Sequence, residues 1–198
     1  MIGAFKANIA LYGGSEDDKK SIQRILDGYK NIELDHQQKG RIRVVDSLDE
    51  MQDEVIGINL NVPGEASIRV EGSDVVIRYS QEDRQCFLEQ LVLLFTGNKV
   101  LDADLADMMP ILKKGCSFHC RRVTEDSFCQ LGEELISEVL DTSGTGVSVV
   151  AQVCGNMTPL LAFQLFEKMG DSDKVETVVC QIVQGDYDGE CIISLFNN

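Results

Sequence analysis

Residues 82–107 read EDRQCFLEQLVLLFTGNKVLDADLAD, an apolar stretch that leads into a cluster of aspartates. Over residues 82–95 the apolar side chains recur at helical spacing. They form one broad face, made of Phe87, Leu88, Leu91, Leu94 and Phe95. A helix this apolar is expected to be buried between two layers, and Gly97-Asn98 is suited to end it. We therefore predict a central helix over residues 82–95.

The acidic segment, residues 102–107, carries three carboxylates, on Asp102, Asp104 and Asp107. Apolar residues anchor it at both ends, since the central helix precedes it and Met-Met-Pro-Ile-Leu follows at residues 108–112. We expect an acidic loop followed by a short apolar turn. Such a loop is either solvated surface in an acidic protein or a set of carboxylates that polarise a water molecule or engage a cation.

The carboxyl-terminal half alternates strands and helices. Strands are expected over residues 116–123, 147–153, 175–183 and 191–196. A helix capped by Thr124 and a second helix that begins at Thr158-Pro159 lie between them. The apolar stripes of these helices are Phe128, Leu131, Leu135 and Val139 in the first, and Leu160, Phe163, Phe166 and Met169 in the second. The order β-α-β-α-β-β predicts a small mixed sheet with packed helices.

The amino-terminal part shows short strands at residues 5–12, 41–45, 55–62, 67–70 and 75–79, and a helix that begins at Ser15. The fold class is therefore α/β (α+β), with two small mixed sheets joined through the central helix. We expect residues 1–80 to form a small α/β region of unknown role. Residues 81–198 form a second domain that includes the central helix and the acidic segment.

Composition limits the partners. With 33 acidic and 18 basic side chains the net charge is −15, which repels phosphate backbones and anionic lipids, so we expect neither nucleic acid nor membrane as a partner. A cationic protein surface is compatible with this charge. No secretion signal or transmembrane run is seen. The expected location is cytoplasmic, with the seven cysteines as reduced thiols.

Three further sequence patterns do not indicate a phosphate-binding or metal-binding site. Gly13-Gly14 precedes three carboxylates that would repel a phosphate, and the glycines of residues 143–146 follow a helix instead of opening one. Cys116, His119 and Cys120 lie on one predicted strand, where alternation turns the histidine away from both thiols. We therefore expect no metal, no cofactor and no catalytic residue acting on its own.

At the acidic segment the chain resembles FtsZ, the bacterial tubulin homologue. In that family a long central helix leads into a loop of pattern Asn-x-Asp-Phe-Ala-Asp-Val, followed by a small mixed sheet with two helices. The family aspartates fall on Asp104 and Asp107, Asp102 stands in place of asparagine, and Leu105 replaces phenylalanine. The resemblance covers roughly residues 82–198 and implies an FtsZ-type carboxyl-terminal domain.

The chain departs from FtsZ before residue 82. The family's GTP-binding domain is far longer, and its signature Gly-Gly-Gly-Thr-Gly-Thr-Gly is absent. The resemblance thus implies a protein without a GTP site of its own. In FtsZ the loop aspartates act on nucleotide held by a neighbouring subunit, so Asp104 and Asp107 would contribute to hydrolysis only in trans. The extra charge of Asp102 opposes efficient catalysis.

Three functions remain open. The first is a cell-division or filament-related protein that self-associates or binds an FtsZ-type partner through Asp102, Asp104 and Asp107. The second is a non-enzymatic ligand-binding or scaffold module that shares only the fold. The third is an enzyme that uses the acidic segment with a divalent cation.

Overall fold

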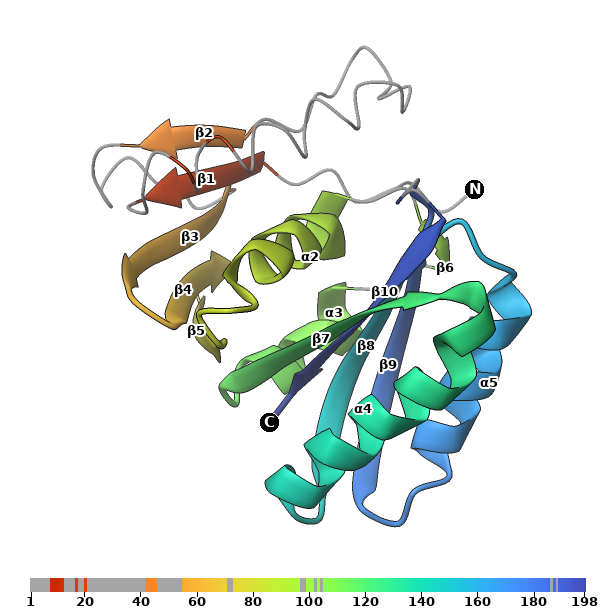
Figure 1. Cartoon of the computed structure of the whole chain (residues 1–198). Helices are drawn as coiled ribbons and strands as arrows, with labels where there is room; N and C mark the ends of the chain where they lie inside the picture. Colours follow the sequence, from red (N-terminus) through yellow and green to blue (C-terminus); the bar gives the residue numbers. More distant parts are fainter. Residues whose placement is uncertain are drawn as a thin grey trace. The chain divides into compact units, whose positions relative to one another are not determined.

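The computed structural model describes residues 8–12, 17, 20, 42–45, 55–70, 73–96, 99–101, 103, 105–185, 187 and 189–198 (Figure 1). The chain divides into two compact units, Met1–Thr96 and Gly97–Asn198. The central helix belongs to the first unit, whereas the division expected from the sequence lies between residues 80 and 81. Each unit is described by itself below.

The first unit contains a mixed sheet of short strands in the order β2-β1-β3-β4-β5. β1 runs parallel to β2 and β3, and β3, β4 and β5 follow one another in antiparallel pairs. Alternate side chains of β4 and β5 are buried, as in a sheet covered on one face. The strands are β1 (Asn8–Tyr12), β2 (Ile42–Val45), β3 (Val55–Val62), β4 (Glu65–Val70) and β5 (Ser73–Arg78).

Helix α2 (Arg84–Thr96) is the predicted central helix. Ser80 and Asp83 bond to each other just before it, since the Asp83 amide donates to the Ser80 hydroxyl at 3.1 Å and that hydroxyl donates to the Asp83 carboxylate at 2.7 Å. Phe87 stacks on Tyr79 with ring centroids 4.3 Å apart. The side chains of residues 87, 88 and 90–94 are all buried. Most of the helix expected from Ser15 lies outside the described residues.

The strands of the second unit, called the second sheet below, pair in the order β7-β10-β8-β9-β6. β10 is antiparallel to both β7 and β8, β8 is parallel to β9, and β6 pairs antiparallel with the end of β9. The strands are β6 (Lys99–Leu101), β7 (Cys116–Thr124), β8 (Val147–Gly155), β9 (Val175–Val183) and β10 (Glu190–Asn197). The expected α/β class, with mixed strand directions and packed helices, is thus confirmed.

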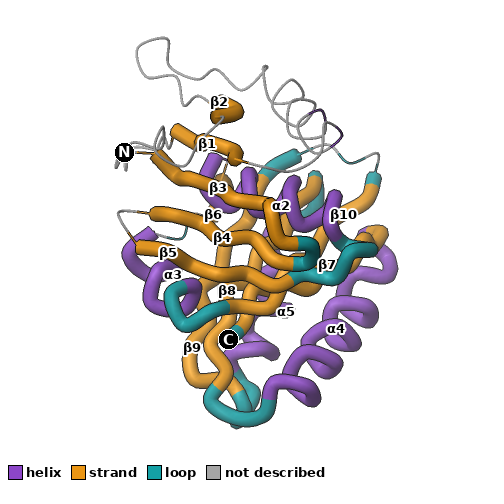
Figure 2. The backbone as a smooth tube through the Cα atoms, turned by 90° about the vertical axis from the view of Figure 1, so that its left-hand side faces the viewer, coloured by secondary structure: helices purple, strands orange, loops and turns teal. Residues whose placement is uncertain are grey.

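Helices cover both faces of this second sheet. On one face α4 (Phe128–Ser143) packs on β7 and β10, and α5 (Pro159–Gly170) packs on β9 beside α4 (Figure 1). α3 (Leu105–Leu112) contacts β8 and β10 and lies on the other side of the strands from α4 (Figure 2). All nine residues of β8 are buried, because a strand covered on both faces has no solvent side.

The core between α4, α5 and the sheet is apolar and closely packed. Gly132 of α4 permits the close approach of α5, because a Cβ at residue 132 would lie 2.9 Å from a methyl of Leu165 on α5. At its edge, Arg121 of β7 donates to Glu138 of α4 at 2.8 and 3.0 Å. The buried side chains include Phe128, Leu135, Val139, Val149, Val153, Leu165, Phe166, Met169, Ile193 and Leu195.

The buried stripe of α5 differs from the one expected. Leu165 and Ala162 join Phe166 and Met169 in the core, whereas Leu160 and Phe163 are 61% and 48% exposed. The helix offers two overlapping apolar rows, and contact with α4 selects between them. The spacing of apolar residues alone could not show which row faces the sheet.

Gly155 ends β8 in a conformation that other residues rarely adopt, with φ at +152°. Its partner across the ladder is Cys191 of β10. A Cβ at residue 155 would lie 2.8 Å from the Cys191 Sγ and 3.1 Å from the Cys191 Cα. Both the backbone angle and the close approach of β10 therefore require glycine here.

Candidate functional site

The structure describes one of the three aspartates of the acidic segment. Asp107 is exposed and stands in the first turn of α3. Asp102 and Asp104 lie outside the described residues, and Ala103 between them is buried. The expected acidic loop over residues 102–107 is corrected in part, because residues 105–107 are helical.

The short apolar turn expected up to Leu112 is also helix. Pro110 disfavours a helix locally, because proline lacks an amide hydrogen and so interrupts the backbone hydrogen bonds of the helix. Burial overrides this local preference. The apolar residues of α3 (Met108, Met109, Ile111 and Leu112) are each at most 5% exposed, and Pro110 faces solvent.

The end of α3 is fixed by several hydrogen bonds. The Lys113 amide donates to the Met109 carbonyl at 2.9 Å, and the Gly115 amide donates to Leu112 at 3.1 Å. The Cys116 thiol approaches the Ile111 carbonyl at 3.5 Å from the start of β7. α3 is thus attached to the sheet through both its apolar side chains and its carboxyl end, which gives Asp107 a rigid base.

Asp107 is available for contact with another molecule. Within the described part of the chain, no lysine or arginine pairs with it. The positive end of the α3 dipole favours a carboxylate in the first turn. An exposed, charged carboxylate on a rigid helix can accept hydrogen bonds or engage a cation on a partner.

The seven cysteines are all free thiols in differing surroundings. Cys116, Cys154 and Cys191 are buried, and Cys129 on α4 is exposed. Burial raises the pKa of Cys116 and Cys180 to about 12, and burial followed by the charge of Glu125 raises the pKa of Cys191. Buried, protonated thiols are poor nucleophiles, so these cysteines serve as small apolar side chains.

Thiol reactivity should follow this division. At pH 8 we expect iodoacetamide to alkylate Cys129 in the native protein at about a thousand times the rate for Cys116, because a pKa of about 12 leaves only about one thiol in ten thousand ionised. Mass spectrometry of timed, quenched digests measures both rates. Equal rates in the native protein would contradict the burial of Cys116.

The same raised pKa has a consequence for stability. The unfolded chain releases the Cys116 proton near the ordinary pKa of 9.0, before the folded chain does at about 12. The folded state therefore loses stability as pH rises through this interval and keeps it below pH 9.

Cys116, His119 and Cys120 lie together on β7, as the sequence predicted. Their ladder partners on β10 confirm the alternation, since His119 is opposite Leu195 and Cys120 is opposite Ser194. Among the described residues, no group of three histidine, cysteine or acidic side chains could hold a metal ion. Similarly, none of the helices that the structure describes is long and apolar enough to cross a membrane.

No protein-family model and no curated protein matches this sequence. Among solved structures, the chain is similar to an empty FtsZ dimer from M. jannaschii, with 16% sequence identity and a TM-score of 0.45. It is also similar to an FtsZ mutant from M. jannaschii, with 14% identity and a TM-score of 0.47. Each match covers 59% of this chain and 38% of the FtsZ chain, and at this identity the likeness concerns the fold alone.

Proposed function

We propose that this chain is a filament-related protein of the FtsZ and tubulin superfamily that has no GTP site of its own and acts by protein contact. It binds an FtsZ-type partner or another copy of itself through the acidic segment. The observation that carries the proposal is the placement of Asp107, which is exposed at the first turn of a helix whose other side is buried. The spacing of Asp104 and Asp107 in the FtsZ-like motif supports the same role.

The acidic segment acts in trans under this proposal. The chain carries no catalytic centre of its own, and at most Asp104 and Asp107 contribute to hydrolysis of GTP that a partner holds. The charge of the acidic segment places it opposite a cationic or hydrogen-bond-donating surface of the partner. Rigid attachment through α3 limits the entropy lost on binding.

The test is an assembly assay with FtsZ from the same organism. At equal molar amounts we expect this chain to change the mass of sedimented polymer or the GTPase rate by at least about twofold. We expect Asp107→Ala to reduce that change several-fold, since removing one partner of a buried, charged contact costs about 2–5 kcal/mol and a rim contact less. Asp126→Ala, which removes another exposed aspartate from the same unit, is the matched control.

Two outcomes would count against the proposal. Unchanged polymer mass and GTPase rate at stoichiometric amounts, together with no self-association in sedimentation velocity, would exclude both forms of it. An effect that survives Asp107→Ala combined with Asp104→Ala would show that the acidic segment is only solvated surface.

A further inference from the structure

One edge of the second sheet is left open. β6 pairs with β9 only at Ile182 and Val183. Over residues 177–180, β9 pairs with β8 on its inner side, and no other strand that the structure describes pairs with its outer side. The backbone amides and carbonyls that point outward there are available to a further strand.

Features that usually protect such an edge are missing from this stretch. Residues 177–180 read TVVC, with neither proline nor lysine, the two residues that most often block edge pairing. The single irregularity in the β8–β9 register falls before Thr177. The side chains of Val178, Val179 and Cys180 are only partly buried. The edge is therefore flat enough and apolar enough to accept a strand.

Helix α5, which packs on β9, carries an exposed aromatic side chain, Phe163. α5 contacts α4 through Leu165 and through the ion pair of Lys168 with Glu133. At 100° per residue, Phe163 lies 160° around the helix from Leu165, so it faces away from α4, toward the β9 side. Phe163 and Leu160 are two of the large apolar side chains that the second unit exposes. A side chain from an added strand could pack against Phe163.

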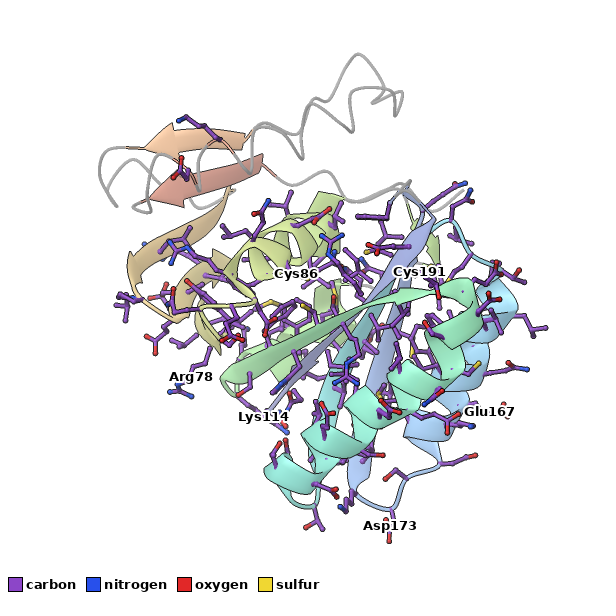
Figure 3. All side chains as sticks on the ribbon, viewed as in Figure 1. Arg78, Cys86, Lys114, Glu167, Asp173 and Cys191 are labelled. Carbon is purple, nitrogen blue, oxygen red and sulfur yellow. The ribbon has the colours of Figure 1, made fainter. Side chains whose placement is uncertain are left out.

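The surroundings of this edge are acidic. Glu167, Asp171, Asp173 and Glu176 are exposed on α5, on the loop after it and at the start of β9. In Figure 3, Glu167 and Asp173 both point outward from the ribbon. The lysines nearby are already engaged, since Lys168 pairs with Glu133 and Lys174 pairs with Asp141. Among the described residues, no cation neutralises these four carboxylates.

We propose that the outer edge of β9, at residues 177–180, binds an extended, basic segment of another protein by strand addition. Main-chain hydrogen bonds supply the pairing, a β-branched or aromatic side chain packs on Phe163, and lysine or arginine residues face Asp173 and Glu176. A second copy of this chain is disfavoured as the occupant, because it would bring the same carboxylates together in a protein of net charge −15. This surface is separate from Asp107 and does not depend on the proposed function.

The test uses three synthetic peptides and the whole protein. The first alternates valine and threonine over seven residues between two pairs of lysines. The second has glutamates in place of the lysines, and the third has proline at the central position, which removes a ladder hydrogen bond. Fluorescence anisotropy measures binding at low salt and again at about 0.5 M salt, where screening weakens charge contacts. Hydrogen exchange locates the bound peptide on the protein.

We expect the lysine-flanked peptide to bind at least about tenfold more tightly than either other peptide, and to slow exchange of amides within residues 177–180. The double change Asp173→Lys with Glu176→Lys should weaken binding about tenfold at low salt and less at high salt. Phe163→Ala should weaken it several-fold. Asp126→Lys, on the β7 side of the sheet, and Asp107→Ala should leave it unchanged.

Several results would overturn the proposal. Tight binding of the proline peptide would rule out strand addition, and unaltered exchange within residues 177–180 would place the peptide elsewhere. Equal binding of the glutamate-flanked peptide would remove the case for a basic partner. The free protein is also tested for self-association. If the double change Asp173→Lys with Glu176→Lys strengthens self-association, the edge binds a second copy of this chain.

Discussion

Phe128→Ala is expected to lower the free energy of unfolding by about 3–5 kcal/mol, the usual range for removing a buried phenylalanine. Phe128 opens α4 and is 0% exposed, in the core shared by α4, α5 and the second sheet. The alanine would leave a cavity that the surrounding strands cannot close. The chain has no tryptophan, so urea unfolding followed by far-UV circular dichroism is the suitable measurement.

The matched control for this change is Phe163→Ala. Phe163 lies on α5, in the same unit, and is 48% exposed, so the same substitution should alter stability by less than about 1 kcal/mol. Because the chain has two compact units, hydrogen exchange in residues 97–198 should accompany the unfolding curve, to show which unit is affected. Equal losses for the two variants would mean that Phe128 is not a core residue.

Gly155→Ala is expected to destabilise the second unit by about 2–6 kcal/mol. One part of the loss is the strain of a side chain at φ +152°, which is of order 1–3 kcal/mol. The other part is the contact of the new Cβ with Cys191, whose Cα would lie 3.1 Å away and belongs to the backbone of β10. Overpacking of this kind typically costs about 1–3 kcal/mol.

Gly170→Ala provides the comparison at a helical glycine. A Cβ at residue 170 would meet no atom within 4 Å, and alanine favours the helix by up to about 1 kcal/mol over glycine. We expect this variant to be as stable as the parent or more stable, in the same urea titration. If Gly155→Ala and Gly170→Ala destabilise the protein to a similar degree, then the backbone angle of Gly155 and the close approach of β10 are not the cause of the loss.

Much of the fold could be predicted from the sequence because the hydrophobic pattern is regular there. Alternation and a following Pro63-Gly64 turn located β3, and its predicted bounds agree with the structure. A β-branched run located β9 equally well. Thr158-Pro159 correctly marked the start of α5. At these places local preference and tertiary packing favour the same structure.

The remainder of the fold depends on tertiary contacts. β6 has only three residues, too few for a periodic signal, and it exists because it pairs with the end of β9. α3 contains Pro110, so local rules argue against a helix that burial nevertheless stabilises. The choice between the two apolar rows of α5 rests on the fit of Leu165 against Gly132.

The candidate site was predictable only in part. The sequence singled out Asp107, and the structure places it exposed on α3, while Asp102 and Asp104 lie outside the described residues. The open edge of β9 could not be seen in the sequence, because strand order decides which strand lies at an edge. A β-branched strand without proline or lysine is equally typical of a sheet centre.

The central place of β10 bears on how the second sheet is made during synthesis. β10 separates β7 from β8, and it is the latest of these strands along the chain. A ribosome that has reached residue 183 has produced β8, α5 and β9, which can already combine as a parallel pair with its connecting helix. Nascent chains of this protein should therefore be able to form that pair before residues 190–197 emerge and join β8 to β7.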